Sequence, residues 1–239
     1  MTFDPFALNQ IGARVGFGTT GISRDDMSDE AAAETFRTAW ESGVRYFDTA
    51  PMYGSGVAEV RTGRALAGIP RDDYVLSTKV GRLVKGAPDV RSAGTDWYYD
   101  FSADGIKRSI AESLERLQLD RVDILYIHDA DDYVDQAVAE AWPVIEQLRS
   151  EGVVRAVGAG NTTVPTLLRF ARETTMDFFL VAGRYTMLAD DAQDELLPLC
   201  IEKGIGVVIA QALHGGLIDG VADPQLYYQP TDDATKAKV

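Results

Sequence analysis

Short apolar runs alternate with amphipathic segments along the chain, and this order restricts the fold more than any other feature. Seven runs have the length and composition of strands: residues 14–17, 44–47, 74–79, 122–128, 153–158, 178–181 and 206–210. Helix-like segments cover residues 29–41, 102–117, 134–151, 163–173 and 190–203. Strand and helix in alternation is the order of a parallel α/β barrel, so we expect the strands at the centre of an α/β fold.

The eighth strand of such a barrel is not found. Residues 231–238 have the pattern of the start of another helix, with Thr231 or Asp232 as its N-cap. We therefore expect a single barrel domain over residues 1–239 that is C-terminally incomplete. The final β/α unit would then lie in a further C-terminal segment or come from another chain, as in a homo-oligomer. If neither holds, the two edge strands are exposed and open to pairing.

Composition excludes several classes of function. No apolar run approaches the ~18 residues of a membrane span, and the N-terminus lacks the basic start of a signal peptide. The single cysteine, Cys200, cannot form an internal disulfide. We expect a cytoplasmic protein without a membrane partner. The formal net charge of −14 also argues against nucleic acid as a partner.

Ionisable side chains follow three successive strand candidates. The second strand is followed by Asp48 and, after a short turn, by Tyr53. The third strand ends at Lys79 and the fourth at His128. Because the carboxyl ends of parallel strands meet at one end of a barrel, we expect these four side chains to share a site.

The four residue types together suit proton transfer to or from an oxygen atom. A phenol has a pKa near ~10, and a neighbouring ammonium group favours its ionised form, so we expect Lys79 to lower the pKa of Tyr53. Asp48 would hold Lys79 charged, and His128 would orient the substrate oxygen. Tyr53 would then act as the acid or base. A hydride must come from a cofactor, because no side chain carries one.

These segments resemble the aldo-keto reductase superfamily. The resemblance runs along the whole chain and is carried by Phe47-Asp48-Thr49-Ala50, Tyr53-Gly54, Thr78-Lys79 and Ile127-His128. Further segments are similar to the branch with D-threo-aldose (L-fucose) 1-dehydrogenases, L-galactose dehydrogenase and pyridoxal 4-dehydrogenase. They are residues 16–21, 58–63, 71–74, 182–185 and 195–200.

The resemblance implies a (β/α)8 barrel that binds NAD or NADP in an extended pose, without a Gly-rich fingerprint. It implies an oxidoreductase that moves a hydride between the nicotinamide and a sugar hemiacetal or aldehyde. The substrate would be an aldose oxidised to its lactone, or pyridoxal oxidised to pyridoxolactone. The alternative is a degenerate barrel that binds a partner chain or a nucleotide without turnover.

The resemblance also assigns cofactor contacts to particular residues: Gly18, Thr19, Asp48, Asn161, Gln211 and Leu213. The chain departs from the family at two strand ends. The sixth strand candidate ends in Val181-Ala182-Gly183-Arg184 where many relatives have Asn-Gln. The seventh places Ala210 where many relatives have an aromatic ring that stacks on the nicotinamide.

A long polar segment, residues 82–99, follows the third strand and has the position of a binding loop. Its Trp97, Tyr98 and Tyr99 suit stacking on a sugar or pyridine ring, although they could equally anchor the loop. We expect Trp97 and Tyr99 to contact substrate, together with Met52 beside Tyr53.

Other polar residues have simpler explanations. The acidic residues after His128 suggest a metal site, but a solvated loop is the better interpretation because the chain has only two histidines and one cysteine. We therefore predict no metal. His214 is either a ligand contact or an ordinary loop residue. Cys200 lies among leucines in a helix pattern, which favours packing over catalysis.

Overall fold

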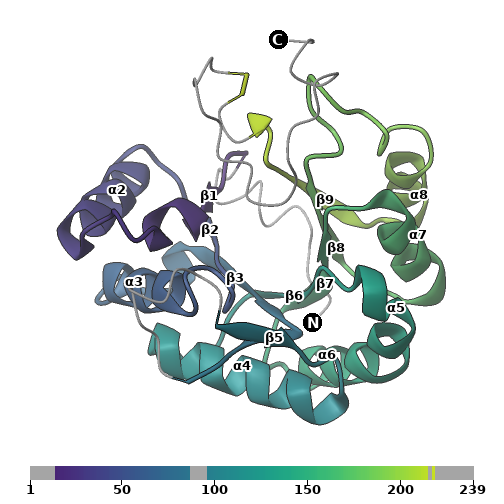
Figure 1. Ribbon diagram of the computed structural model, residues 1–239, viewed down its shortest axis with the longest axis horizontal. Coiled ribbons are helices and arrows are strands. Elements are labelled where there is room, and N and C mark those ends of the chain that lie inside the picture. The colour runs from purple at the N-terminus through teal and green to yellow at the C-terminus, as the bar shows by residue number, and fades with distance from the viewer. Residues whose placement is uncertain (1–13, 87–95, 215–216, 219–239) are drawn as a thin grey trace.

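The centre of the computed structural model is a seven-stranded parallel sheet that curls toward closure, with helices outside it (Figure 1). The structure describes residues 14–86, 96–214 and 217–218. The strands follow the order β1-β2-β3-β6-β7-β8-β9. Their bounds are Phe17–Gly18 (β1), Tyr46–Asp48 (β2), Val75–Val80 (β3), Ile124–His128 (β6), Ala156–Asn161 (β7), Phe178–Ala182 (β8) and Gly206–Ala210 (β9).

All six strand pairings in this sheet are parallel, so the carboxyl ends of the strands lie at one end. Among the described residues, β1 and β9 each have only one neighbouring strand. The predicted parallel barrel without its last unit is therefore confirmed for the part described. The helix start expected at residues 231–238 lies outside it.

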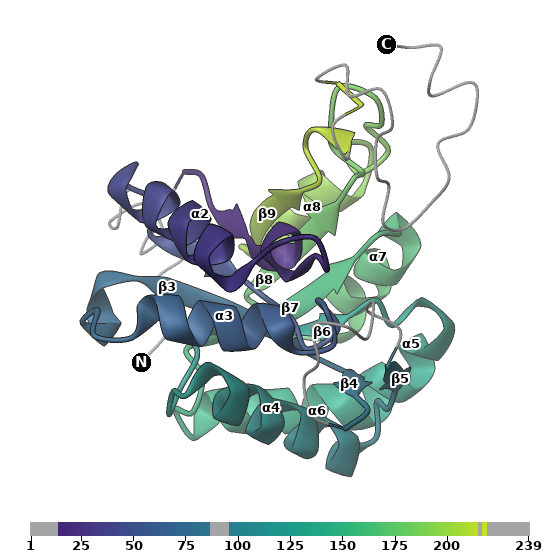
Figure 2. The ribbon, with the colours of Figure 1, turned by 60° about the vertical axis from the view of Figure 1, so that its left-hand side comes forward.

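Helices connect successive strands and cover the outer face of the sheet. Figure 2 shows α2, α3 and α4 in succession on the outside. The α-helices are α2 (Asp29–Glu41), α3 (Val57–Leu66), α4 (Ala103–Leu117), α5 (Val134–Gln136), α6 (Trp142–Ser150), α7 (Val164–Glu173) and α8 (Leu196–Lys203). Short 3-10 turns are η1 (Thr19–Ser23), η2 (Arg71–Asp73) and η3 (Asp131–Tyr133), and η4 (Ala137–Ala141) is a π-helix.

Capping residues mark several helix ends as predicted. Ser28 accepts a hydrogen bond from the Ala31 N–H at 3.1 Å and starts α2. Of the two candidates at α4, Ser102 is the cap, and its hydroxyl accepts from the Gly105 N–H. Gly204 ends α8 in the left-handed conformation with φ of 70°.

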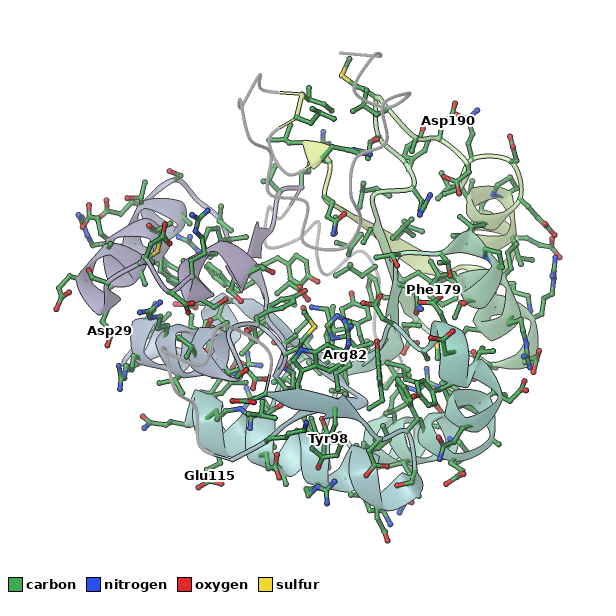
Figure 3. All side chains as sticks on the ribbon, viewed as in Figure 1. Asp29, Arg82, Tyr98, Glu115, Phe179 and Asp190 are labelled. Atoms are coloured by element: carbon green, nitrogen blue, oxygen red, sulfur yellow. The ribbon has the colours of Figure 1, made fainter. Side chains whose placement is uncertain are left out.

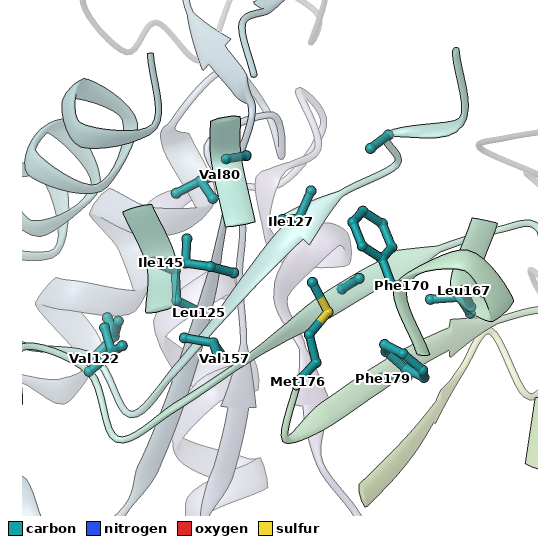
Figure 4. Close-up of a cluster of buried hydrophobic side chains, with 14 of the residues drawn as sticks. Val80, Val122, Leu125, Ile127, Ile145, Val157, Leu167, Phe170, Met176 and Phe179 are labelled. Atoms are coloured by element: carbon teal, nitrogen blue, oxygen red, sulfur yellow. The ribbon is translucent and has the colours of Figure 1, made fainter. Parts of the chain in front are cut away.

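Side chains of the sheet alternate between two clusters. One points outward to the helices and contains the apolar residues of Figure 4, among them Leu125, Ile127, Val157 and Phe179. The other fills the barrel interior with Tyr46, Val75, Ile124, Tyr126, Ala156, Phe178 and Leu180. This two-residue period fixes which strand positions face the interior, and hence which can reach a site at its end.

Two helices differ from the prediction because of proline. The helix expected from residue 190 starts at Leu196, since Pro198 has no N–H and fits only in a first turn. The single helix expected over residues 134–151 contains the π-helical segment Ala137–Ala141, which ends two residues before Pro143. Proline cannot donate the regular backbone bond, and a π-bulge accommodates that loss.

Helix α3 was not predicted, because Gly63 in its middle is a poor helix former. The structure gives the reason for that glycine. A Cβ atom at Gly63 would lie 2.2 Å from the carbonyl oxygen of Leu117 in α4. The two helices therefore pack backbone to backbone at this point, and tertiary packing outweighs helix propensity.

Two strand boundaries and one loop also differ. Residues 14–16 lie outside β1, and β7 begins at Ala156 because the Val153 and Val154 N–H groups bond back to Leu148. The segment expected to be a loop contains an antiparallel pair, β4 (Arg82–Val84) and β5 (Trp97–Tyr99). Cys200 is buried in the outer core as predicted, and burial raises its thiol pKa to about 11. None of the helices in the described ranges has the length and apolar character needed to cross a membrane.

Candidate active site

The four predicted site residues meet at one cavity at the carboxyl end of the barrel strands. Asp48, Lys79 and His128 come from β2, β3 and β6, and Tyr53 from the turn after β2. Each of the four is less than 10% exposed. The cavity is lined by Gly18, Thr20, Asp48, Tyr53, Lys79, His128, Asp129, Gly160, Asn161, Thr162, Leu180, Ala182, Ala210 and Gln211.

Asp48 and Lys79 form a buried ion pair at the cavity floor. Lys79 Nζ donates to Asp48 Oδ2 at 2.6 Å and to the Thr49 carbonyl at 2.8 Å. The same ammonium lies 4.6 Å from the centre of the Tyr53 ring, within cation–π range. Asp48 therefore fixes the position of Lys79, as the sequence predicted.

The Tyr53 phenol is neutral in this environment. Burial raises its pKa above the ordinary value of 10, the charge of Asp48 raises it further, and a hydrogen bond with the Thr20 side chain opposes the rise. The expected lowering of this pKa by Lys79 was wrong for this structure. The reason is that burial, with the charge of Asp48 added to it, raises the pKa and outweighs the effect of the nearby ammonium.

His128 is also neutral. Burial lowers its pKa well below 6.5, and the positive charges of Lys79 and Arg82 add to that effect. Its ring meets the Tyr53 ring edge-on, with 5.9 Å between centroids and an angle of 89°. Its Nδ1 has no hydrogen-bond partner among the described residues. A neutral imidazole beside a neutral phenol presents a proton donor and an acceptor at the same place.

A chain of buried hydroxyl groups extends from Asp48 into the barrel. Ser77 Oγ donates to Asp48 Oδ1 at 2.6 Å, and the Tyr46 hydroxyl lies 3.0 Å from Ser77 Oγ. The Tyr126 hydroxyl follows at 3.5 Å from that of Tyr46. Since Ser77 spends its only proton on the carboxylate, each hydroxyl donates toward Asp48. Both oxygens of Asp48 are therefore held, one by Lys79 and one by Ser77.

These three hydroxyls were not predicted from the sequence, although their strand positions relative to the site residues indicate them. Tyr46, Ser77 and Tyr126 each precede a site residue by two positions on its strand. Residues two apart in a strand face the same side. A site residue that points into the barrel therefore predicts that its neighbour two positions earlier does so too.

The predicted cofactor residues of the first strand are only partly at the cavity. Gly18 lines it, whereas Thr19 is fully buried and Thr20 occupies the cavity wall instead. The turn η1 begins at Thr19, so the side chains no longer alternate as in a strand. Thr20, which contacts Tyr53, was missed for this reason.

Amide side chains line the opposite wall. Asn161 is the last residue of β7. In the amide orientation that gives both of its polar atoms a partner, its oxygen accepts from the Ala130 N–H at 3.2 Å and its nitrogen donates to the Gly160 carbonyl at 3.1 Å. Gln211 follows β9 and also lines the cavity. Leu213 is 53% exposed and lies outside the cavity lining.

The three predicted substrate contacts lie beside the cavity rather than in its lining. Met52 packs on the small cluster of Ala50, Tyr53 and Ala58. Trp97 and Tyr99, in the β4–β5 hairpin, contact the Arg82 side chain. In the view of Figure 3, Arg82 lies just above this hairpin. Their predicted role as substrate contacts stays a prediction.

The remaining candidates are at other positions. His214 is outside the cavity lining, and burial lowers its pKa. Within the described ranges, no three His, Cys, Asp or Glu side chains are grouped as a metal site requires. Asp131 instead accepts hydrogen bonds from Thr163 and Thr166 and holds the start of α7.

The residues present fit a nicotinamide ring. Gly18, Gly160, Ala182 and Ala210 present little or no side chain to the cavity, and the amides of Asn161 and Gln211 also line it. An amide both donates and accepts, which matches a carboxamide group. The cavity therefore combines a place for a flat ring with a proton donor at its floor.

Sequence comparison identifies the family that this arrangement comes from. The model of the aldo/keto reductase family matches residues 14–238. A D-threo-aldose 1-dehydrogenase from a Pseudomonas species is 42% identical over 219 residues, which are 85% of this chain and 67% of that protein. An L-galactose dehydrogenase from Arabidopsis thaliana is 34% identical over 230 residues, 92% of this chain and 68% of that protein.

Structure comparison agrees. An aldo-keto reductase from Bacillus halodurans in its holo form superposes with a TM-score of 0.72 and 28% identity, over 85% of this chain and 63% of that one. The chain thus spans about two thirds of the length of the proteins it matches. The branch named from the sequence motifs is confirmed.

Proposed function

The chain belongs to the aldo/keto reductase family of NAD(P)-dependent oxidoreductases, and we propose that it oxidises the hemiacetal carbon of an aldose to a lactone. The observation that carries the proposal is the buried contact of Tyr53, Lys79, Asp48 and His128 at one cavity. The identity of 42% with an aldose dehydrogenase supports a sugar as the substrate.

In this proposal Tyr53 moves the proton at the reacting oxygen. NAD or NADP accepts the hydride during oxidation and supplies it during reduction. In oxidation Tyr53 must first release its own proton, and the phenolate then takes the proton of the sugar hydroxyl; in reduction the phenol gives its proton to the carbonyl oxygen. Because its pKa is raised, the phenol is the resting form and is ready for the reductive direction.

The other three residues prepare Tyr53 for this step. Lys79 over the phenol ring stabilises the negative charge that appears when Tyr53 loses its proton. Asp48 holds Lys79 in that position through the 2.6 Å ion pair. His128 is kept neutral by burial, so it binds the reacting oxygen without adding a positive charge that would favour the phenolate permanently.

Tyr53→Phe tests the proposal, because it removes the hydroxyl and keeps the ring. We expect turnover of an aldose with NAD or NADP to fall by roughly 10²- to 10⁴-fold, the range of a general acid–base group. Tyr185→Phe is the matched control, since Tyr185 is 42% exposed and outside the cavity lining. Unchanged turnover in Tyr53→Phe would overturn the assignment of this residue.

Turnover measured with a set of aldoses and with pyridoxal decides between these two kinds of substrate. We expect lactone formation from at least one aldose, measured by NAD(P)H absorbance, and weaker turnover of pyridoxal. A chain that quenches its tryptophan fluorescence on binding NADH or NADPH but turns over no substrate would support the degenerate barrel instead.

A further inference from the structure

A second buried ion pair lies beside the four site residues and contains no group that transfers the proton. Arg82 Nη1 donates to Asp129 Oδ2 at 2.7 Å, and both side chains are at most 10% exposed. Arg82 begins β4 just after β3, and Asp129 directly follows His128. Buried ion pairs contribute little net stability because desolvating two charges is costly, so this pair calls for another explanation.

The Asp129 carboxylate is part of the cavity wall. One of its oxygens lies 3.7 Å from His128 Nε2, which is too long for a hydrogen bond but places the two groups side by side. The residue has a positive φ of 45°, an uncommon conformation for a residue other than glycine. Its N–H donates to the Gly160 carbonyl at 2.9 Å, which holds this backbone in place.

Arg82 is fixed from the other side by the hairpin. Its Nη2 donates to the Tyr99 hydroxyl at 3.0 Å, and its guanidinium lies 4.4 Å from the Trp97 ring centre. Trp97 and Tyr99 pack edge-on to one another at 5.1 Å. The two aromatic residues thus restrain Arg82, and Arg82 restrains the carboxylate at the cavity.

We propose that Asp129, positioned by Arg82, binds a substrate hydroxyl on the carbon next to the reacting carbon and so selects α-hydroxylated substrates such as aldoses. This proposal rests on the proposed function. An ionised carboxylate only accepts hydrogen bonds, so it favours a hydroxyl over an apolar group. His128 would face the reacting oxygen, and the adjacent carboxylate is placed for the oxygen of the neighbouring carbon.

The pair is also close enough to affect the acid–base group. The charges of Asp129 and Arg82 act on the pKa of Tyr53 with opposite signs, Asp129 raising it and Arg82 lowering it. A carboxylate without its arginine would therefore leave an uncompensated negative charge beside Tyr53. With Arg82 beside it, the Asp129 carboxylate can accept a hydrogen bond from a substrate hydroxyl and change the pKa of Tyr53 less.

The test compares an aldose with its 2-deoxy analogue, using the full chain and the same nicotinamide cofactor. In Asp129→Ala, kcat/KM for the aldose should fall about 10- to 100-fold, the range of one hydrogen bond to a charged group. The loss for the 2-deoxy analogue should be far smaller. Asp129→Asn, which keeps the shape, should show the same selective loss to a lesser degree.

Asp132→Asn is the matched control, because Asp132 is an exposed acid on the same loop. It should change neither substrate's kcat/KM. An equal loss on the two substrates in both Asp129 variants would overturn the proposal and make the ion pair a latch for the hairpin. A wild-type chain that oxidises neither substrate would instead refute the proposed function, so the two failures are distinguishable.

Discussion

Ser77 Oγ donates a 2.6 Å hydrogen bond to Asp48 Oδ1, on the opposite side of that carboxylate from Lys79. The serine is completely buried. Asp48 is therefore oriented by two donors, and its second oxygen is aimed at the lysine that lies over Tyr53. Ser77 acts on the proposed chemistry through Asp48 and is a positioning residue.

Removing the hydroxyl of Ser77 should lower turnover more than substrate affinity. In Ser77→Ala, Asp48 loses one of its two side-chain donors and holds Lys79 less firmly over the phenol ring, while the Thr49 carbonyl still accepts from Lys79. We expect kcat to fall about 10-fold, which corresponds to about 1.4 kcal/mol, with KM nearly unchanged. Steady-state kinetics with an aldose measures both values.

Ser109→Ala is the control for this substitution. Ser109 is buried like Ser77, but its hydroxyl has no partner among the described residues. Its removal should leave kcat within experimental error. Equal losses of activity in the two variants would mean that burial of a serine, not the bond to Asp48, is responsible.

The pH dependence of sugar oxidation should report on Asp129. Burial, joined by the charge of Asp131, raises its pKa from about 3.8 to about 6, while Arg82 and Lys79 oppose the rise. If the ionised form binds the hydroxyl, kcat/KM for an aldose should increase as the pH rises through about 6. Neighbouring His128 is neutral across this window because its pKa is lowered, and Tyr53 is neutral because its pKa is raised.

The free energy of unfolding should change with pH in the opposite direction to kcat/KM. The folded protein holds the Asp129 proton more tightly than the unfolded chain between about 3.8 and 6. This group's contribution to the free energy of unfolding is therefore lost as the pH rises through that window.

In Asp129→Asn the rise of kcat/KM near pH 6 should disappear. A step that survives in this variant belongs to another group.

The strand ends carried most of what could be predicted about the site. Asp48, Lys79 and His128 were found because an ionisable residue after an apolar run is conspicuous, and parallel strands end together. Thr20 was missed because the turn η1 interrupts the alternation that would have placed it. The sequence pattern therefore predicts where a side chain points on a regular strand, and it fails where the strand passes into a turn.

Long-range contacts could not be derived from the sequence. Arg82 and Asp129 are 47 residues apart, and neither position shows that they form an ion pair. The raised pKa of Tyr53 likewise depends on its burial and on the charge of Asp48 beside it, which only the folded arrangement sets. The expected homo-oligomer or complementing C-terminal segment and the cytoplasmic location stay predictions.

Removing one partner of the buried ion pair between α3 and α4 should destabilise the protein. Glu59 is fully buried, and it accepts from Arg116 Nε at 2.7 Å and from Thr78 Oγ1 at 2.6 Å. Glu59→Ala takes the buried carboxylate away from Arg116, whose other acidic neighbour, Glu112, is 3.7 Å away and 36% exposed. We expect the free energy of unfolding to fall by about 3–5 kcal/mol in urea denaturation.

A surface ion pair of the same types is the comparison for Glu59. Glu34 and Arg37 are more than half exposed and form an i,i+3 pair on α2. Glu34→Ala should cost far less stability than Glu59→Ala, because water screens exposed charges. If Glu59→Ala and Glu34→Ala lower the free energy of unfolding equally, burial does not determine the cost of losing an ion pair.

Gly63→Ala should destabilise the protein, against the usual effect of alanine in a helix. Within a helix, alanine is normally favoured over glycine by roughly 0.5–1 kcal/mol. At this position the new Cβ would lie 2.2 Å from the Leu117 carbonyl oxygen, so α3 and α4 must separate. We expect a loss of about 1–3 kcal/mol, as for overpacked cores.

Gly21→Ala is the control, because it has open space around its Cβ and should change stability by less than about 0.5 kcal/mol. A stabilised Gly63→Ala variant in urea denaturation would show that the helices yield at this contact and that the glycine is not required there.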